Sequence, residues 1–276
     1  MNHGIVLSGR LTRPLVGAVA ILVALFLVFP VLIILPVSFS SGSFLAFPPP
    51  GWSLQWYERV LSRPDWLSSV WLSVWIACVV MALSTVLGTA GAIGLARGRF
   101  PGQRILIGFI LSPLIIPGII VAIGVYFFYA RIHFVGSALA IAMAHTALAV
   151  PFVVVNVSAS LYAVDRRLEQ AAQNLGAGDF ATFRLITLPL IRPGIAAGAL
   201  FAFITSFDEL IVALFIAGPT QVTLPLRMWE SMKSSIDPTI AAVSMLAILL
   251  SVLLFASAAW LQARVRKVSG APRSTP

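Results

Sequence analysis

The sequence carries little charge for its length. Only 10% of its 276 residues are Asp, Glu, Lys or Arg, whereas a soluble domain carries about 25%. Hydrophobic residues make up 59% of the chain, and its mean hydropathy is +1.01. A surface made from so few charges would not stay in water. The composition therefore predicts an integral membrane protein.

Cysteine and lysine are also scarce. The single cysteine, Cys78, excludes a disulfide or a thiolate metal site formed within the chain. Neither of the lysines, Lys233 and Lys267, follows a GxxxxG loop, so the phosphate-binding motif of an ATPase is missing. HExxH, GxSxG and Cys/His clusters are missing as well. We therefore expect no enzyme and no cofactor or metal in this chain, and any ATP-Mg would bind to a separate subunit.

The formal net charge of +9 could suggest nucleic acid as a partner. The basic residues, however, gather at the ends of apolar runs, where the positive-inside rule places them in membrane proteins. We therefore expect contact with membrane lipid and no contact with nucleic acid.

Six apolar runs are long enough to cross a membrane, which takes about 20 residues. Only helices suit runs of this length and uniformity. The first run is longer than the apolar part of a signal peptide and is expected to be retained. The prediction is an all-α integral membrane protein with one transmembrane domain over residues 1–276. Its spans are expected at about 15–37, 70–95, 105–129, 136–161, 194–217 and 239–261.

The distribution of Lys and Arg predicts the orientation. With the N-terminus in the cytoplasm, 13 of the 18 basic residues lie inside and 5 outside. This bias places both termini in the cytoplasm and predicts a multi-pass protein of a bacterial inner (plasma) membrane. The outer set is Arg59, Arg63, Arg131, Arg227 and Lys233.

Prolines interrupt several of these runs. Pro113, Pro117 and Gly118 lie in the third run, and Pro151 lies in the fourth. Buried prolines kink membrane helices, and small residues let neighbouring helices approach closely. Two interpretations stay open: ordinary helix packing, or kinked helices that line a pathway which opens and closes.

The longest inside connection, residues 163–193, is polar and patterned. Leu168, Ala171, Ala172 and Leu175 follow the i, i+3, i+4, i+7 spacing of one helix face. Asp165 is a suitable N-cap, and Gly176 is a suitable stop. A second short helix is expected over 180–187, capped by Asp179 and ending before Pro189.

The apolar face of the first of these helices is narrow and built from small residues. A helix lying on lipid would favour bulky residues opposite a lysine-rich face. Alanines instead let another protein approach the backbone closely. Docking of a protein is therefore preferred to the alternative of a membrane-surface helix.

The same segment resembles the EAA motif of ABC importer permeases. Gln170, Ala171 and Ala172 are followed after three residues by Gly176, and after nine more by Ile186, Thr187, Leu188 and Pro189. In that family the motif forms the coupling helix that enters a groove on the ATPase subunit. The chain departs from the motif at its first position, where Gln170 replaces the usual Glu and Glu169 lies one residue earlier. The resemblance implies an ATPase-coupling set of Glu169, Gln170, Ala171, Ala172, Leu175, Gly176, Ile186, Leu188 and Pro189.

Further segments are similar to the spermidine/putrescine branch of these permeases, and in particular to its second permease subunit. They are PPPGWSLQWYERVL, PLIIPGII, HTALAVPFVVV and the stretch that begins SFDELIV. The resemblance implies a type I importer fold and a polyamine delivered by an extracytoplasmic solute-binding protein. It also implies a homodimer of ABC ATPase subunits and a sister permease in a heterodimer with this chain.

Asp208 and Glu209 are the acidic residues that fall inside a predicted span. Each charge there costs about 2.5–3.5 kcal/mol on insertion scales, so it needs a partner, water or a function. One interpretation is pairing with a neighbouring helix. The other is an anionic patch for a cationic solute, with Thr205 on the face of Asp208 and with Trp229 and Glu230 at the outer mouth. His145, in the fourth span, is interpreted as a packing residue.

Two other functions stay open. One is an ABC permease for another small solute, such as an amino-acid-like molecule or a phosphonate. The other is a secondary transporter that works alone, which would normally show several intramembrane ionisable groups or an internal repeat. One acidic pair and no clear repeat favour the ABC permease.

Overall fold

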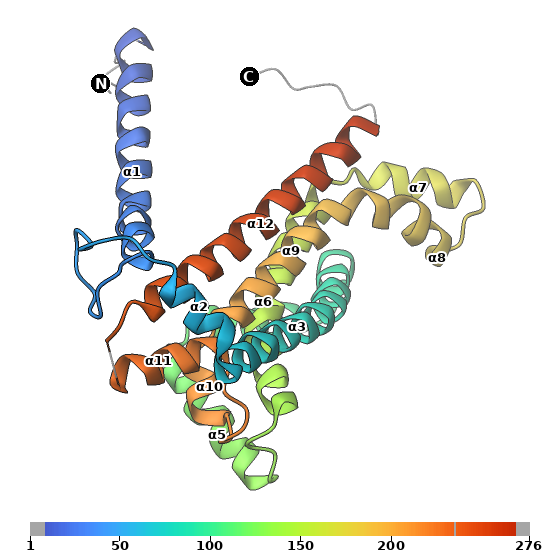
Figure 1. Ribbon diagram of the computed structural model, residues 1–276. Coiled ribbons are helices and arrows are strands. Elements are labelled where there is room, and N and C mark those ends of the chain that lie inside the picture. The colour runs from blue at the N-terminus through green and yellow to red at the C-terminus, as the bar shows by residue number, and fades with distance from the viewer. Residues whose placement is uncertain (1–8, 235, 269–276) are drawn as a thin grey trace, which may run out of the picture. The chain divides into compact units, whose positions relative to one another are not determined.

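The computed structural model describes residues 9–234 and 236–268. Regular structure in these ranges is helical, apart from an isolated bridge between Ser40 and Trp52. This agrees with the all-α prediction (Figure 1). The helices are α1 Gly9–Ser38, α2 Gln55–Ser62, α3 Pro64–Arg97, α4 Gln103–Leu111, η1 Ser112–Leu114, α5 Gly118–Arg131, α6 Ala138–Ala163, α7 Arg166–Asn174, α8 Asp179–Thr182, η2 Phe183–Thr187, α9 Leu188–Phe207, α10 Ile211–Ile216, α11 Leu224–Ser234 and α12 Thr239–Val268.

Five helical stretches in the described ranges are long and apolar enough to cross a membrane. A sixth span results if a bent pair of helices is counted as one. This agrees with a multi-pass membrane protein. The five stretches are Pro14–Ser38, Pro64–Arg97, Ala138–Ala163, Asp179–Phe207 and Thr239–Ser257.

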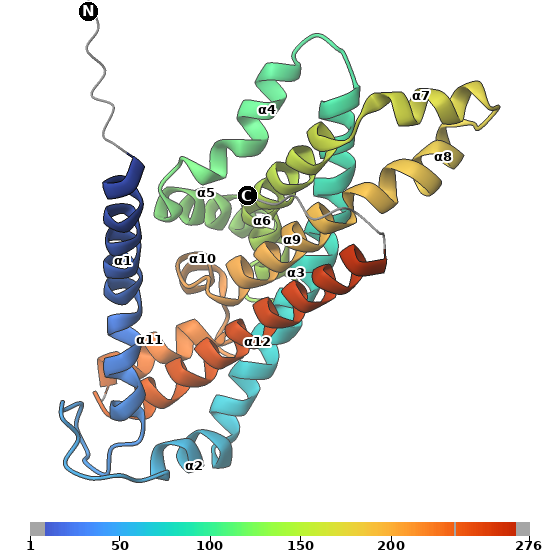
Figure 2. The same cartoon turned by 90° about the horizontal axis from the view of Figure 1, so that it is seen from above.

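The bent pair occupies the third predicted span, 105–129. Gln103–Leu114 and Gly118–Arg131 meet at 104°, which is a break and not a kink (Figure 2). Pro117 is the N-cap of α5, with φ −54° and ψ 130°, outside the helical region. Because proline also disfavours the helical conformation of the residue before it, the chain turns here.

Contacts divide the described chain into two compact units. One comprises residues up to Arg63 together with Ser231–Ile248, and the other comprises Pro64–Glu230 and the chain from Leu249 onward. The single transmembrane domain expected over residues 1–276 stays a prediction.

In the larger unit, α3, α6 and α9 pack against one another. Val153 of α6 is fully buried between a glycine of each neighbour. A Cβ on Gly88 of α3 would lie 2.6 Å from Val153 Cβ, and one on Gly198 of α9 would lie 2.9 Å from Val153 Cα. The three helices approach this closely because neither glycine carries a side chain.

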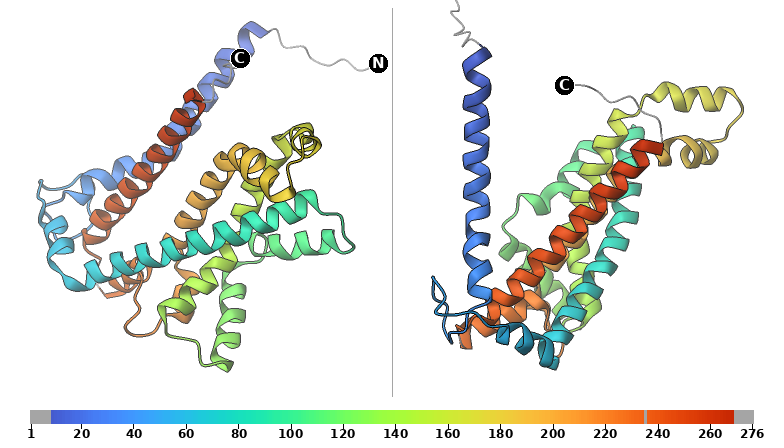
Figure 3. Two further views of the ribbon diagram at one scale, coloured as in Figure 1. Left: turned by 90° about the vertical axis from the view of Figure 1, so that its right-hand side faces the viewer. Right: turned by 45° about the horizontal axis from the view of Figure 1, so that its top comes forward.

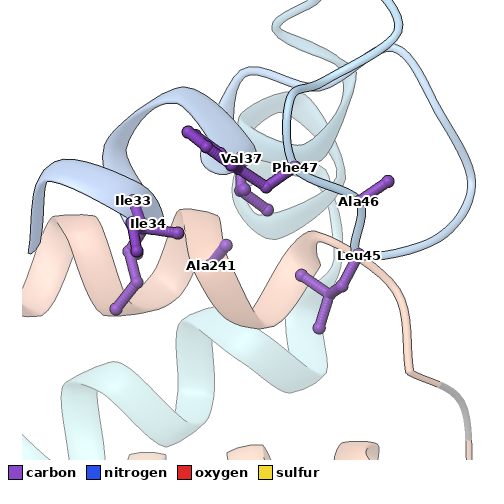
Figure 4. Close-up of a pocket in the computed structure, with 7 residues that line it drawn as sticks. All are labelled: Ile33, Ile34, Val37, Leu45, Ala46, Phe47 and Ala241. Atoms are coloured by element: carbon purple, nitrogen blue, oxygen red, sulfur yellow. The ribbon is translucent and has the colours of Figure 1, made fainter. Parts of the chain in front are cut away.

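In the smaller unit, α1 presents mostly exposed apolar side chains, as expected of a helix that faces lipid. Figure 4 shows an apolar pocket of this unit, lined by α1, the following loop and Ala241 of α12. Arg59 of α2 forms an ion pair with Asp237, with 3.0 Å between Nη1 and Oδ2. Asp237 also accepts a hydrogen bond from the backbone N–H of Thr239 and so caps α12.

The fifth predicted span, 194–217, is not one helix. α9 ends at Phe207, residues 208–210 are non-helical, and α10 begins at Ile211. The prediction of one continuous helix through Asp208 is therefore wrong. The acidic pair lies in the interruption itself.

The connection over residues 163–193 forms a helical hairpin of α7 and α8 that extends from the ends of α6 and α9 (Figures 1 and 3). The first helix is as predicted. Asp165 is its N-cap and accepts from Arg167 N–H at 2.9 Å, and Gly176 follows its end at φ +90°. Ala177 N–H donates to Ala172 C=O at 3.0 Å, which closes the helix end.

The second part of the connection differs from the prediction. The N-cap of α8 is Gly178, not Asp179, and the helix does not end before Pro189. It passes through the π-helical η2 into α9 and forms one apolar stretch from Asp179 to Phe207. A proline lacks the N–H of an α-helical bond and its ring clashes with the preceding turn, and a wider π-turn before Pro189 accommodates it.

Candidate functional site

The predicted docking face of α7 is exposed. Leu168 is 50% exposed and Leu175 is 89% exposed, although both are large apolar side chains. Ala171 is exposed, and Ala172 is half-buried. A short helix that forms one arm of a hairpin and leaves an apolar face exposed has a surface suited to another protein.

Glu169 and Gln170 point to different surroundings. Gln170 is exposed. Glu169 is half-buried, and its Oε1 lies 2.8 Å from Arg97 Nη2 at the end of α3 and 2.8 Å from Thr187 Oγ1 in η2. The carboxylate of this pair of residues therefore faces the chain's own helices, and the neutral amide faces outward.

The remaining motif residues lie in η2, in the first turn of α9 and at the turn between α7 and α8. Ile186 is half-buried in η2, and Leu188 and Pro189 are half-buried in the first turn of α9. Gly176 lies at the turn between α7 and α8, where its φ of +90° favours glycine. The motif thus combines the exposed face of α7 with the residues that join this hairpin to α9.

Glu209 caps α10. Its carboxylate accepts from the backbone N–H groups of Ile211 at 3.1 Å, Val212 at 2.8 Å and Ala213 at 3.3 Å. These are the amides that a helix start leaves without a partner. A carboxylate at this end also interacts favourably with the helix dipole.

The same carboxylate approaches a buried histidine. His145 of α6 is 1% exposed, and its Nε2 lies 3.4 Å from Glu209 Oε2. Its Nδ1 lies 3.0 Å from the hydroxyl of Ser206 on α9. His145 therefore links α6 to the interruption after α9, and its interpretation as a packing residue stays a prediction.

Asp208 and Thr205 are more exposed than His145. The Asp208 side chain is exposed, and Thr205 is half-buried one turn earlier in α9. Of the two adjacent acids, Glu209 therefore bonds to other parts of the fold, whereas the side chain of Asp208 is exposed.

Trp229 and Glu230 belong to α11, which is attached to α3. Leu224 N–H donates to Ser73 Oγ at 2.7 Å, and Arg227 Nε donates to Ser69 Oγ at 3.4 Å. Glu230 is exposed and lies 3.4 Å from Arg227 Nη1, which offsets part of its charge. The contacts of this group and of the Asp208 region therefore run to different helices.

Three partners of the acidic residues were not predictable from the sequence. Arg97 and Thr187 lie 72 and 18 residues from Glu169, and His145 lies far before Glu209 in another helix. One signal was present: Arg97 follows an apolar run at its predicted inside end, the same side as residue 169. A charge in that position can pair with an acid of a neighbouring loop.

Residues 84–267 match the family of binding-protein-dependent transport system inner membrane components. The chain belongs to this family. It is thus a permease subunit of the inner membrane and not an enzyme, and the family implies an ATP-driven system with a separate ATPase.

Two curated relatives cover most of the permease. The putrescine transport system permease protein PotI of Escherichia coli strain K12 is 36% identical over 250 residues, 88% of each chain. The spermidine/putrescine transport system permease protein PotC of the same strain is 29% identical over 246 residues, 89% of this permease and 92% of the relative.

The fold of the permease is that of known ABC importers. A chain of a bacterial alginate ABC transporter, solved with its alginate pentasaccharide-bound periplasmic protein, superposes with a TM-score of 0.71. The two chains are 12% identical, and the match covers 93% of this permease and 95% of the other. This likeness concerns the fold and agrees with the type I importer architecture expected from the sequence.

Proposed function

We propose that the permease forms half of the translocation pathway of an ATP-driven importer for a polyamine such as putrescine or spermidine. The observation that carries the proposal is its 36% identity to a putrescine permease over 88% of both chains.

The open carboxylate of Asp208 supports a cationic solute. Polyamines are cations with an apolar methylene chain, and a carboxylate in a pathway attracts and binds their ammonium groups. Thr205 adds a hydroxyl one turn away. We propose Asp208 as the residue that meets the solute, Thr205 as a neighbour, and Trp229 and Glu230 as parts of the outer mouth.

The exposed face of α7 supports docking of an ATPase subunit. In the proposed topology both termini and this connection lie in the cytoplasm, where ATP is hydrolysed. A homodimer of ATPase subunits would contact α7 of this chain and the equivalent helix of a sister permease. A solute-binding protein would deliver the polyamine on the opposite side.

Ala172→Arg tests the docking role. Ala172 lies on the docking face of α7, and a long charged side chain there would hold the partner surface away. Uptake by the reconstituted complex should be lost, and co-purification of the ATPase should fall. Asn174→Arg is the matched control, because it adds the same charge to the same helix outside the docking face. It should reduce uptake and ATPase co-purification much less. Normal assembly and uptake with Ala172→Arg would contradict the docking role.

Asp208→Asn tests the contact with solute. The variant removes one negative charge without changing the size of an exposed side chain, so putrescine uptake should fall by about tenfold, or ~1.4 kcal/mol. The assembled complex and its ATP hydrolysis without solute should persist. Unchanged putrescine uptake by the variant would contradict a contact between Asp208 and the solute. Strong uptake of an amino acid or a phosphonate by the unaltered complex, without uptake of putrescine, would support the other solute classes.

A further inference from the structure

We propose that Glu169 is a positioning residue that transmits displacement of α7 to α3 and α9. Glu169, Arg97 and Thr187 are called the Glu169 junction below. The inference rests on the proposed function, because it assigns a mechanical role to the segment that would dock the ATPase. It differs from direct contact with the ATPase, which would require Glu169 to face outward.

One carboxylate oxygen joins three elements. Glu169 Oε1 on α7 accepts from Arg97 Nη2 at the end of α3 and from Thr187 Oγ1 in η2, both at 2.8 Å. The side chains of Arg97 and Glu169 are 21% and 17% exposed, so water screens this ion pair only in part. A charge-assisted hydrogen bond of this length is about twice as strong as a neutral one.

Neighbouring contacts strengthen the same attachment. Arg166, in the first turn of α7, donates from Nη2 to Ala96 C=O at 2.7 Å. Gln173, in its last turn, donates to Asp179 Oδ1 at 3.0 Å and so connects α7 with α8. Both ends of α7 are therefore connected by polar side chains, while its apolar face stays open.

The junction leads directly into the packed helices. α3 and α9 pack on α6 and on each other. α9 runs without interruption from Leu188 to Phe207, and the next residues are Asp208 and Glu209. Rigid secondary-structure elements can carry coupling between distant sites, so we expect a shift at the start of α9 to reach the interruption at its end, although Pro193 lies within the helix.

These observations explain why Glu169 and Gln170 differ in chemistry. A charge at residue 169 has an internal partner in Arg97, whereas residue 170 faces outward and carries a neutral amide. The ATPase would move α7 through its apolar face, and the junction would transfer this movement to α3 and α9. Loss of the junction should therefore uncouple ATP hydrolysis from transport and leave docking intact.

The test uses the reconstituted complex of permease, sister permease, ATPase and solute-binding protein, with putrescine as the solute. The variants are Glu169→Gln, Arg97→Gln and the charge swap Arg97→Glu with Glu169→Arg. Glu58→Gln, an exposed glutamate of α2, is the matched control. The ratio of putrescine imported to ATP hydrolysed should fall by about fivefold or more in both single variants, the lower end of ordinary coupling between sites. The swap should restore much of it.

Two results from the single variants would overturn the inference. One is an unchanged ratio in both single variants. The other is loss of ATPase binding in Glu169→Gln but not in Arg97→Gln, which would mean that Glu169 faces the ATPase. If both single variants fold poorly, the swap decides: recovered coupling supports the junction, and no recovery rejects it.

A second measurement does not depend on transport. Deuterium uptake by peptides of α7 should rise in both single variants and return toward the original level in the swap. Equal protection in all forms would reject the junction even if the complex imports no polyamine. Failure of import by the unaltered complex, with deuterium uptake changing as expected, would reject the proposed solute and not the junction.

Discussion

In two pairs of adjacent polar residues, one side chain bonds within the fold and the other is exposed. At residues 169 and 170, Glu169 bonds to the chain's own helices and Gln170 is exposed. At residues 208 and 209, Glu209 caps α10 and Asp208 is exposed. In both places one side chain bonds to other parts of the fold and its neighbour is exposed.

The residue scale gives a stability prediction for the second pair. Glu209→Ala removes the acceptor for three backbone amides of α10 and the neighbour of His145. Losing a side-chain cap at a helix start costs about 0.5–2 kcal/mol. Thermal unfolding of the purified permease should therefore occur at a lower temperature, with Asp208→Ala as the control. An equal loss of stability in Asp208→Ala would contradict the separate roles.

The helices show which local sequence signals were sufficient to predict where a helix begins and ends. α7 could be predicted because its signals are local: Asp165 caps it, Gly176 ends it, and its apolar residues repeat at helical spacing. The end expected before Pro189 was wrong because the π-turn of η2 lets the helix continue. The interruption at 208–210 was missed because long apolar stretches continue on both sides of the acidic pair, and the cap that begins α10 is visible only in three dimensions.

Gly176 gives a prediction at the element scale. Gly176→Ala places a Cβ on a residue with φ +90°, although nothing lies within 4 Å of that Cβ. The cost is therefore backbone strain, about 1–2 kcal/mol, and it should loosen the end of α7. Deuterium exchange of the α7–α8 hairpin should rise, while exchange in α6 should stay the same. Gly178→Ala, with φ −68°, is the control and should have little effect.

The packing of α3 on α6 gives a second prediction at the element scale. Gly88→Ala would bring a Cβ to 2.6 Å from Val153 Cβ, while a Cβ on Gly94 of the same helix meets nothing within 4 Å. Overpacking of this kind costs about 1–3 kcal/mol. Gly88→Ala should lower the unfolding temperature and the yield of folded permease, and Gly94→Ala should not. Equal behaviour of the two variants would contradict the close approach at Val153.

At the scale of the whole molecule, composition was enough to predict the class of protein. A chain with 59% hydrophobic and 10% charged residues is predicted to be an integral membrane protein, and the transporter class came from the resemblance of its motifs to a known family. The break in the third span could not be predicted from composition, because a proline in an apolar run can kink a helix or divide it. After the 104° turn α5 packs against α10, a contact that the composition does not reveal.

The purified permease alone should hydrolyse no ATP, because it lacks a phosphate-binding loop. Phosphate release by the permease alone, by the ATPase alone and by the full complex is the measurement. Activity should require the ATPase subunit in every case. ATP hydrolysis by the permease without it would contradict the division of labour between the subunits.

Uptake of labelled putrescine into proteoliposomes tests the central claim most directly. The vesicles contain the permease, its sister permease and the ATPase, with ATP on the ATPase side and the solute-binding protein on the other. We predict uptake that stops when ATP or the solute-binding protein is omitted. Uptake that continues at the same rate without ATP, or with the permease as the sole protein, would contradict an ATP-driven importer and would indicate a transporter that works alone.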